Sequence, residues 1–148
     1  MPSPAASICA AGTLRRATRS VARIYDAHLA RAGLTTTQFS LLVALERRAT
    51  PTPLTELAAE QVFERTSLYR AIAPLEREGL VALTAGAGRS KQVQLTAKGV
   101  RRVADARPHW QSAQDAFLAE FGRSAWGGLA KQLAAIVDVA RDIPAASE

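Results

Sequence analysis

Apolar residues recur every three or four positions through most of the chain, the spacing that places side chains on one face of an α-helix. This spacing predicts four helices before residue 80, and it returns after residue 96. The four expected helices cover residues 10–33, 35–49, 55–62 and 64–79. Pro51 and Pro53 interrupt the pattern between the second and third helices, because a proline disfavours helix in the residue before it.

Capping residues mark several of these helix ends. Thr35 and Gln38 have the spacing of a capping box, in which each side chain bonds the other residue's backbone N–H. Thr55 is a candidate N-cap for the short third helix, and Thr96 for the helix that follows the fourth. Gly79 is placed to end the fourth helix, since glycine readily adopts the left-handed conformation common after a helix C-terminus.

The pattern changes to a period of two after residue 80. Val81 and Leu83 alternate with other residues, and the same alternation returns at Val93 and Leu95. The glycine-rich run AGAGRSK lies between them and carries two cations. Two short strands around such a tip predict a β-hairpin. The expected fold class is therefore mainly α with a small β-hairpin.

The C-terminal part shows two further helical stripes, separated by Gly122. We expect Pro108 to kink or break the first of these helices, because proline lacks an N–H and clashes with the preceding turn. The stripes comprise Trp110, Ala113, Phe117, Leu118 and Phe121, then Trp126, Leu129, Leu133, Ile136 and Val137. These faces have little local core to cover them, which favours a homodimer. A monomer whose terminal helices fold back on the rest is the alternative.

Residues 64–79 are expected to form a helix with two different faces. At about 100° per residue, Leu68, Ile72 and Leu75 fall together and make a core stripe. The other side carries Thr66, Tyr69, Arg70, Ala73 and Arg77. Reading of a DNA major groove requires such groups, because arginine can bond guanine bidentately and hydroxyls can bond phosphates or base edges. An ordinary solvated surface helix is the alternative.

The basic hairpin favours DNA binding over a solvated surface. A solvated hairpin turn needs only two or three residues, whereas AGAGRSK is longer. Its Arg89 is suited to enter a narrow, electronegative minor groove. A short helix, a tight turn, a reading helix and a basic hairpin together predict a winged helix–turn–helix with double-stranded DNA as its partner.

Charge is distributed unevenly, with a formal net value of +6 for the chain. Residues 64–103 hold eight basic and three acidic side chains, whereas residues 104–148 hold four basic and six acidic ones. This balance indicates a polyanionic partner for one part of the chain. It leaves open a nonspecific architectural or RNA-binding protein that acts through its basic surface alone.

The runs LTTTQFSLLVALERR, LTELAAEQVFERTSLYRAIAPLEREGLV and GRSKQVQLTAKG resemble the MarR family of bacterial transcriptional regulators. The resemblance covers about residues 12–122 and is most specific between Leu54 and Gly99. It implies an obligate homodimer with intertwined terminal helices. It also implies a repressor that leaves a pseudo-palindromic operator on binding a small phenolic compound or on oxidation.

The same resemblance assigns DNA contacts to the reading helix and to the wing. Together with two cations chosen from the residue pattern, Arg77 and Lys91, the expected DNA-binding residues are Arg65, Thr66, Ser67, Tyr69, Arg70, Arg77, Arg89 and Lys91. Two positions depart from the family pattern. Ala87 stands where an acidic residue usually braces the wing arginine, and Val62 replaces a glycine common in the turn before the reading helix.

A ligand pocket is expected where the terminal helices meet the DNA-binding part. Its expected lining is Tyr25, His28, Phe39 and Trp110. Apolar walls with a few polar groups are suited to an aromatic carboxylate or a phenol. Aromatic residues at helical spacing are more often plain core, and that interpretation stays open beside the pocket.

Cys9, the only cysteine, lies near the start of the first helix, where a helix N-terminus favours the thiolate. It is a candidate redox site, but a passive buried thiol is the interpretation that the sequence favours. A single cysteine excludes an internal disulfide framework and indicates a reducing, cytoplasmic setting. No run of about 18 apolar residues predicts a membrane span. His28 and His109 are isolated, so we expect no metal site, no cofactor and no enzyme.

The expected organisation follows from these assignments. Residues 1–9 form a disordered tail, residues 10–33 a dimerisation helix, residues 34–103 the winged helix–turn–helix domain, and residues 104–148 a C-terminal helical dimerisation region.

Overall fold

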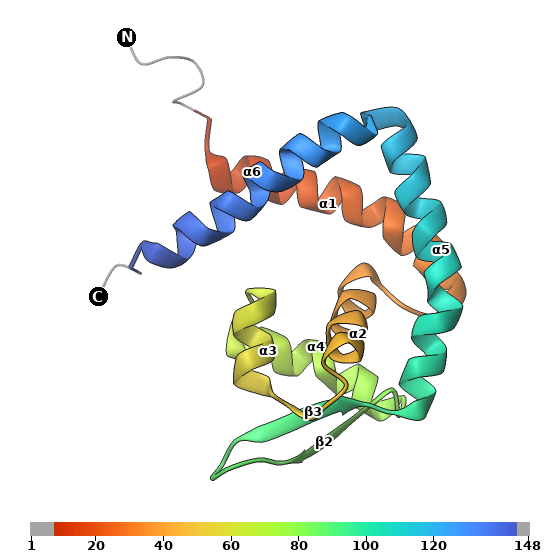
Figure 1. Ribbon diagram of the computed structural model, residues 1–148, viewed down its shortest axis with the longest axis vertical. Coiled ribbons are helices and arrows are strands. Elements are labelled where there is room, and N and C mark those ends of the chain that lie inside the picture. The colour runs from red at the N-terminus through yellow and green to blue at the C-terminus, as the bar shows by residue number, and fades with distance from the viewer. Residues whose placement is uncertain (1–7, 145–148) are drawn as a thin grey trace. The chain divides into compact units, whose positions relative to one another are not determined.

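The computed structural model of the chain describes residues 8–144, so most of the expected disordered tail lies outside the described residues. Six α-helices and three short strands follow one another within that range (Figure 1). They are α1 (Ala10–Leu29), α2 (Thr36–Arg48), β1 (Thr52–Pro53), α3 (Leu54–Gln61), α4 (Arg65–Arg77), β2 (Val81–Ala85), β3 (Lys91–Leu95), α5 (Ala97–Phe121) and α6 (Arg123–Asp142). A short 3-10 helix, η2 (Ala30–Ala32), extends α1. The fold class expected from the sequence is confirmed.

Local capping determines where α2 begins. The capping box is present: the Gln38 N–H donates to the Thr35 hydroxyl oxygen at 3.2 Å, and the Thr35 N–H donates to Gln38 Oε1 at 3.0 Å. Asp26 of α1 adds a second anchor, since its Oδ1 accepts from the Thr36 N–H at 2.7 Å and from the Thr36 hydroxyl at 2.6 Å. These bonds fix the start of α2 against α1.

One expectation about a helix start is wrong, and one of the two outcomes expected at Pro108, a break, is excluded. Thr55 does not cap α3, because the helix begins one residue earlier, at Leu54, with Pro53 in the N-cap position. The ring of Pro53 fixes φ and leads the chain directly from β1 into the helix. Pro108 does not break α5, which continues through it. Pro108 and Ala104 are both exposed, so water can hydrate the Ala104 carbonyl that the proline leaves without a donor.

The sheet has three antiparallel strands in the order β1-β3-β2. The expected hairpin is formed by β2 and β3, which pair from Val81 opposite Leu95 to Ala85 opposite Lys91. The third strand, β1, pairs Thr52 with Val93. A two-residue strand shows no alternation in the sequence, and β1 is held by pairing with a strand some 40 positions later. The connection of α2 to α3 is thereby attached to the wing.

The described residues up to Ala113 form one compact unit, whose core is a single cluster of buried apolar side chains from α1 to the first half of α5. Leu68, Ile72 and Leu75 anchor α4 in this core and are at most 1% exposed. The start of α5 packs closely on the turn after α4, since a Cβ at Gly99 would lie 2.1 Å from the Leu80 carbonyl oxygen. The expected Thr96 cap is confirmed by the Gly99 N–H, which donates to the Thr96 hydroxyl oxygen at 3.0 Å.

Residues from Gln114 onward form a second unit made of the end of α5 and all of α6. Phe117 stacks on Phe121 with ring centroids 5.4 Å apart, and it meets the edge of Trp126 at 5.6 Å. No residue of α6 is buried within the chain. Its apolar stripe includes Ile136, which is 45% exposed, and Val137, which is 36% exposed.

Candidate nucleic-acid interface

Helix α4 presents its polar side to solvent. Its exposed residues include Arg65, Thr66, Ser67, Arg70 and Arg77, whereas Tyr69 is half-buried against the core. Within residues 8–144, Arg65, Arg70 and Arg77 take part in no ion pair. No side chain caps the N-terminus of α4, so its first N–H groups are open to an acceptor. The helix therefore combines a rigid apolar anchor with an unpaired cationic face.

The turn before α4 is tight and strained. Val62 has φ +56° and ψ +45°, the left-handed conformation that a β-branched residue rarely adopts, and its side chain is 63% exposed. The Phe63 N–H closes the turn by donating to the Ala58 carbonyl at 2.8 Å. A glycine would adopt this backbone freely, which explains why glycine is the usual residue at such a turn.

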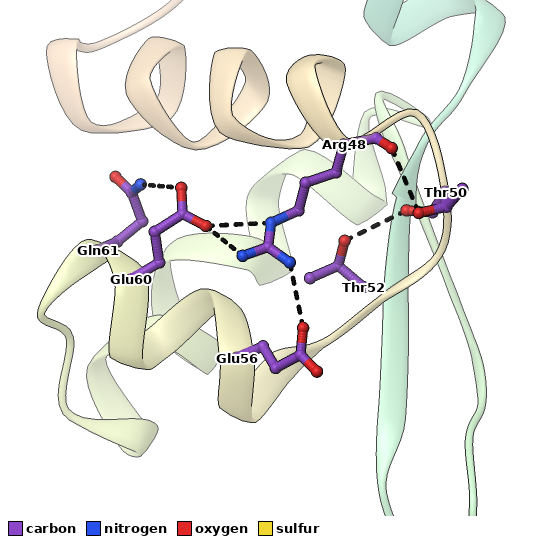
Figure 2. Close-up of polar contacts among 6 residues, drawn as sticks. All are labelled: Arg48, Thr50, Thr52, Glu56, Glu60 and Gln61. Atoms are coloured by element: carbon purple, nitrogen blue, oxygen red, sulfur yellow. Dashed lines mark hydrogen bonds and ion pairs between the residues drawn. The ribbon is translucent and has the colours of Figure 1, made fainter.

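Arg48 fixes the helix that precedes this turn (Figure 2). From the end of α2, its Nε donates to Glu60 Oε2 at 3.0 Å and its Nη1 donates to Glu56 Oε2 at 3.1 Å. Hydrogen bonding from Arg48 lowers the pKa of the Glu60 carboxyl below its ordinary value, and the same bond raises the pKa of Arg48. The sequence shows Glu56 and Glu60 on one side of a helix, but it does not show which distant cation reaches them.

The hairpin between β2 and β3 ends in a hydrogen-bonded tip, which we call the wing tip (residues 86–90). The Gly86 N–H donates to the Ser90 carbonyl at 2.9 Å, and the Ser90 hydroxyl donates to the Ala87 carbonyl at 2.6 Å. Gly88 has φ +63°, a conformation that favours glycine. Arg89 and Lys91 are exposed, and neither takes part in an ion pair within the described part of the chain. With alanine at position 87, no carboxylate at that place holds Arg89.

A hollow of about 290 Å³ opens between α2, the end of α3 and α5. Phe39 and Trp110 form one wall and stack with their ring centroids 6.2 Å apart. The remaining lining residues are Ser40, Val43, Ala44, Arg47, Gln61 and Arg107. We call this space the aromatic hollow.

The structure brings together two of the four residues expected to line a ligand pocket. Phe39 and Trp110 line the aromatic hollow, whereas Tyr25 and His28 do not. Tyr25 is buried in the core, and this burial raises the pKa of its phenol. Two cations at the hollow were missed, Arg47 and Arg107. Arg47 lies at helical spacing from Phe39 and Arg107 from Trp110, so only the pairing of α2 with α5 was needed to find them.

Cys9 occupies the N-cap position of α1, as expected, and its Sγ accepts from the Gly12 N–H at 3.4 Å. Within the single chain Cys9 is exposed, which contradicts the favoured interpretation of a buried thiol. Within residues 8–144 no group of three or more histidine, cysteine or acidic side chains is placed to hold a metal ion. None of the helices described there has the length and apolarity to cross a membrane.

Comparison with protein-family models and with curated proteins found no match. Solved structures gave clear matches. The M. tuberculosis transcriptional regulator MosR in complex with DNA is 37% identical, has a TM-score of 0.81, and is aligned over 90% of this chain and 97% of its own. A MarR-family transcriptional regulator from Rhodococcus sp. RHA1 is 21% identical, with a TM-score of 0.78 and coverage of 93% and 96%.

A third match, CouR from Rhodococcus jostii RHA1 bound to p-coumaroyl-CoA, is 23% identical, with a TM-score of 0.76 and coverage of 99% and 100%. The last two matches support the fold, and MosR, which is more similar in sequence and spans nearly the whole chain, shows the family. These proteins regulate transcription and are not enzymes. The chain belongs to the MarR family of transcriptional regulators.

Proposed function

We propose that this regulator is a homodimeric repressor that binds a pseudo-palindromic operator in double-stranded DNA with sequence specificity. The observation that carries the proposal is the outer face of α4, where Arg65, Arg70 and Arg77 are exposed without an ion pair in the described residues. Unpaired guanidinium groups on a helix that is anchored in the core are the groups that major-groove reading uses. The MosR structure, which holds DNA, supports this assignment.

Each part of the surface has a separate task in this proposal. Arg70 lies in the middle of the exposed face and reads a base edge, because arginine bonds guanine bidentately. Thr66 and Ser67, in the first turn, hold a phosphate together with the uncapped N–H groups of α4. Arg65, Tyr69 and Arg77 are assigned to the backbone or to flanking bases. Arg89 and Lys91 of the wing are assigned to the minor groove and its phosphates.

The dimer forms, in this proposal, through residues 10–33 and 104–148, which leaves residues 34–103 for DNA. The apolar stripe of α6 supports it: Ile136 and Val137 are exposed within one chain. A contiguous patch of exposed apolar side chains marks an interaction surface. A twofold dimer would present two copies of α4 about 34 Å apart, one turn of DNA, so each half-site would meet one helix.

Release from DNA is assigned to a small aromatic effector in the aromatic hollow or to oxidation of Cys9. The stacked wall of Phe39 and Trp110 supports an aromatic effector, and CouR, with the same fold, carries p-coumaroyl-CoA. The exposure of Cys9 gives an oxidant access to its sulfur. Either event would act by population shift, favouring a dimer whose reading helices no longer match the operator.

The test begins with the genomic DNA that the purified protein retains, sequenced with and without peroxide. On the sequence found, Arg70→Ala is expected to weaken binding by about 1–3 kcal/mol and to relax the preference at one base position. Arg101→Ala is the matched control, since Arg101 is an exposed arginine on α5 outside the proposed interface. An equal loss on every DNA sequence would indicate the nonspecific architectural alternative. The absence of any enriched sequence would refute the proposed function.

A further inference from the structure

One ion pair closes the edge of the aromatic hollow. Arg107 of α5, which lines the hollow, pairs through Nη2 with Oε2 of Glu46 on α2. The Arg107 side chain is 52% exposed and that of Glu46 is 29% exposed, so the pair can open without disturbing the core. Exposed pairs of this kind contribute little to stability, which makes exchange of the partner easy.

The charge around the aromatic hollow is not balanced. Arg47, a second lining residue, is exposed and takes part in no ion pair within residues 8–144. The carboxylate on which Arg47 acts electrostatically is that of Glu60, and Glu60 is already bonded to Arg48. Two guanidinium groups thus face one available carboxylate, that of Glu46, beside an aromatic wall. An anion with a flat apolar body complements this arrangement.

We propose that Glu46 is a built-in competitor of the effector, and that the effector is an aromatic carboxylate. In the free protein the Glu46 carboxylate holds Arg107. A bound aromatic acid would place its ring against Phe39 and Trp110 and its carboxylate on Arg107, in place of Glu46. The inference rests on the proposed function for the role of the hollow, and it chooses between the two effector classes left open there. A neutral phenol lacks the charge needed to replace a carboxylate at a guanidinium.

The size of the hollow limits the effector to a small one. About 290 Å³ is at the lower end of the range of ligand sites, so a single aromatic ring with its carboxylate is the expected scale. Glu46 also sets a threshold, because the effector must overcome an existing ion pair before Arg107 becomes available. Removing the competitor should therefore tighten binding, whereas removing an ordinary lining group should weaken it.

The hollow is connected to the DNA-reading part through α3. Gln61, the last residue of α3, lines the hollow, and it directly precedes the strained Val62 in the turn before α4. The Gln61 side chain also donates to Glu60 Oε1 at 3.2 Å, so it belongs to the cluster that fixes α3. An effector that draws on Gln61 would act on the turn that places α4. By linkage, bound DNA must then weaken the binding of the effector by the same factor by which the effector weakens the binding of DNA.

The test uses Trp110 as the reporter, in full-length protein carrying Trp126→Phe so that one tryptophan remains. Benzoate, benzamide and phenol serve as probes, with calorimetry as a second readout. We expect benzoate to bind at least about tenfold more tightly than either neutral probe, the scale of one charge-assisted hydrogen bond. Glu46→Gln should tighten the binding of benzoate by roughly three- to tenfold and leave the binding of benzamide unchanged. Glu46→Asp, whose carboxylate reaches less far, should bind benzoate with an affinity between those of the original protein and Glu46→Gln. It takes the place of Glu46→Gln in the test if that variant does not fold.

The remaining variants test Arg107. Arg107→Gln is expected to weaken the binding of benzoate about tenfold or more, and Arg101→Gln on the same helix should leave this binding unchanged. The inference is overturned if benzoate does not bind, if benzamide or phenol binds as tightly as benzoate, or if Glu46→Gln fails to tighten the binding of benzoate. Binding of the enriched DNA by the effector-free protein is measured separately. A protein that binds DNA but fails these tests loses this inference alone.

Discussion

Replacement of Val62 by glycine tests the idea that strain is stored in the turn before α4. Val62 is held at φ +56°, where its Cβ and branched methyl groups crowd the backbone. Its side chain is 63% exposed, so the substitution removes little buried apolar surface. The change therefore acts mainly on backbone strain, and we expect Val62→Gly to stabilise the protein.

The magnitude follows from two opposing effects. A residue other than glycine in a sparsely populated backbone region costs roughly 1–3 kcal/mol in the folded state. Glycine in turn gives the unfolded chain more freedom, which costs about 0.4–1 kcal/mol. The net gain in the free energy of unfolding should be about 1 kcal/mol. For a chain of 148 residues this corresponds to a rise in Tm of about 2–4 °C.

The assay is urea unfolding followed by tryptophan fluorescence, at one fixed protein concentration because a dimer's stability depends on concentration. Val62→Ala is the matched control. It removes the branching and keeps a Cβ at positive φ, so its stability should lie between those of the original protein and Val62→Gly. If Val62→Gly proves less stable than Val62→Ala, stored strain at this turn is refuted.

Three further changes follow from the structure. Ala87→Asp restores a carboxylate beside Arg89 and should tighten DNA binding relative to Ala87→Asn, as measured by fluorescence anisotropy; equal affinities would contradict a bracing role. The lowered pKa of Glu60 means that its bond to Arg48 contributes stability above the ordinary value of 4.5, and that this contribution is lost as pH falls through the lower folded pKa. In Glu60→Gln, the urea midpoint should therefore depend less on pH over that acidic range, and a pH dependence equal to that of the original protein would contradict this expectation. Gly99→Ala should destabilise by about 1–3 kcal/mol, although alanine normally favours a helix, because its Cβ would meet the Leu80 carbonyl; a rise in Tm would show that the contact can relax.

The sequence predicts most of this fold because its helices carry local information. The capping box at Thr35 and Gln38, the Thr96 cap and the three buried residues of α4 all depend on spacings of a few positions. The strand β1 depends instead on pairing with β3, far along the chain, and two residues carry no period. The misplaced Thr55 cap has a similar origin, since the proline that starts α3 also belongs to β1.

The candidate site divides in the same way. The exposed face of α4 follows from a helical wheel, and the structure places Arg70 and Arg77 on the solvent side as expected. The aromatic hollow depends on which helices pack together, and for this reason the sequence wrongly predicts Tyr25 in its lining, whereas the residue lies in the core. The pairing of Glu46 with Arg107 joins positions 61 residues apart and has no local pattern.

The alanine at position 87 leaves the Arg89 side chain of the hairpin without a carboxylate to hold it. An arginine side chain without an anchor keeps its rotamers until DNA is bound, and fixing them costs up to about 2 kcal/mol. In the proposed complex, Arg89 could thus follow minor grooves of different width, with a lower affinity than a preordered arginine would give. If α4 and the wing bind DNA as proposed, discrimination between operators falls mainly to α4, and sites that differ only beneath the wing should be bound equally well.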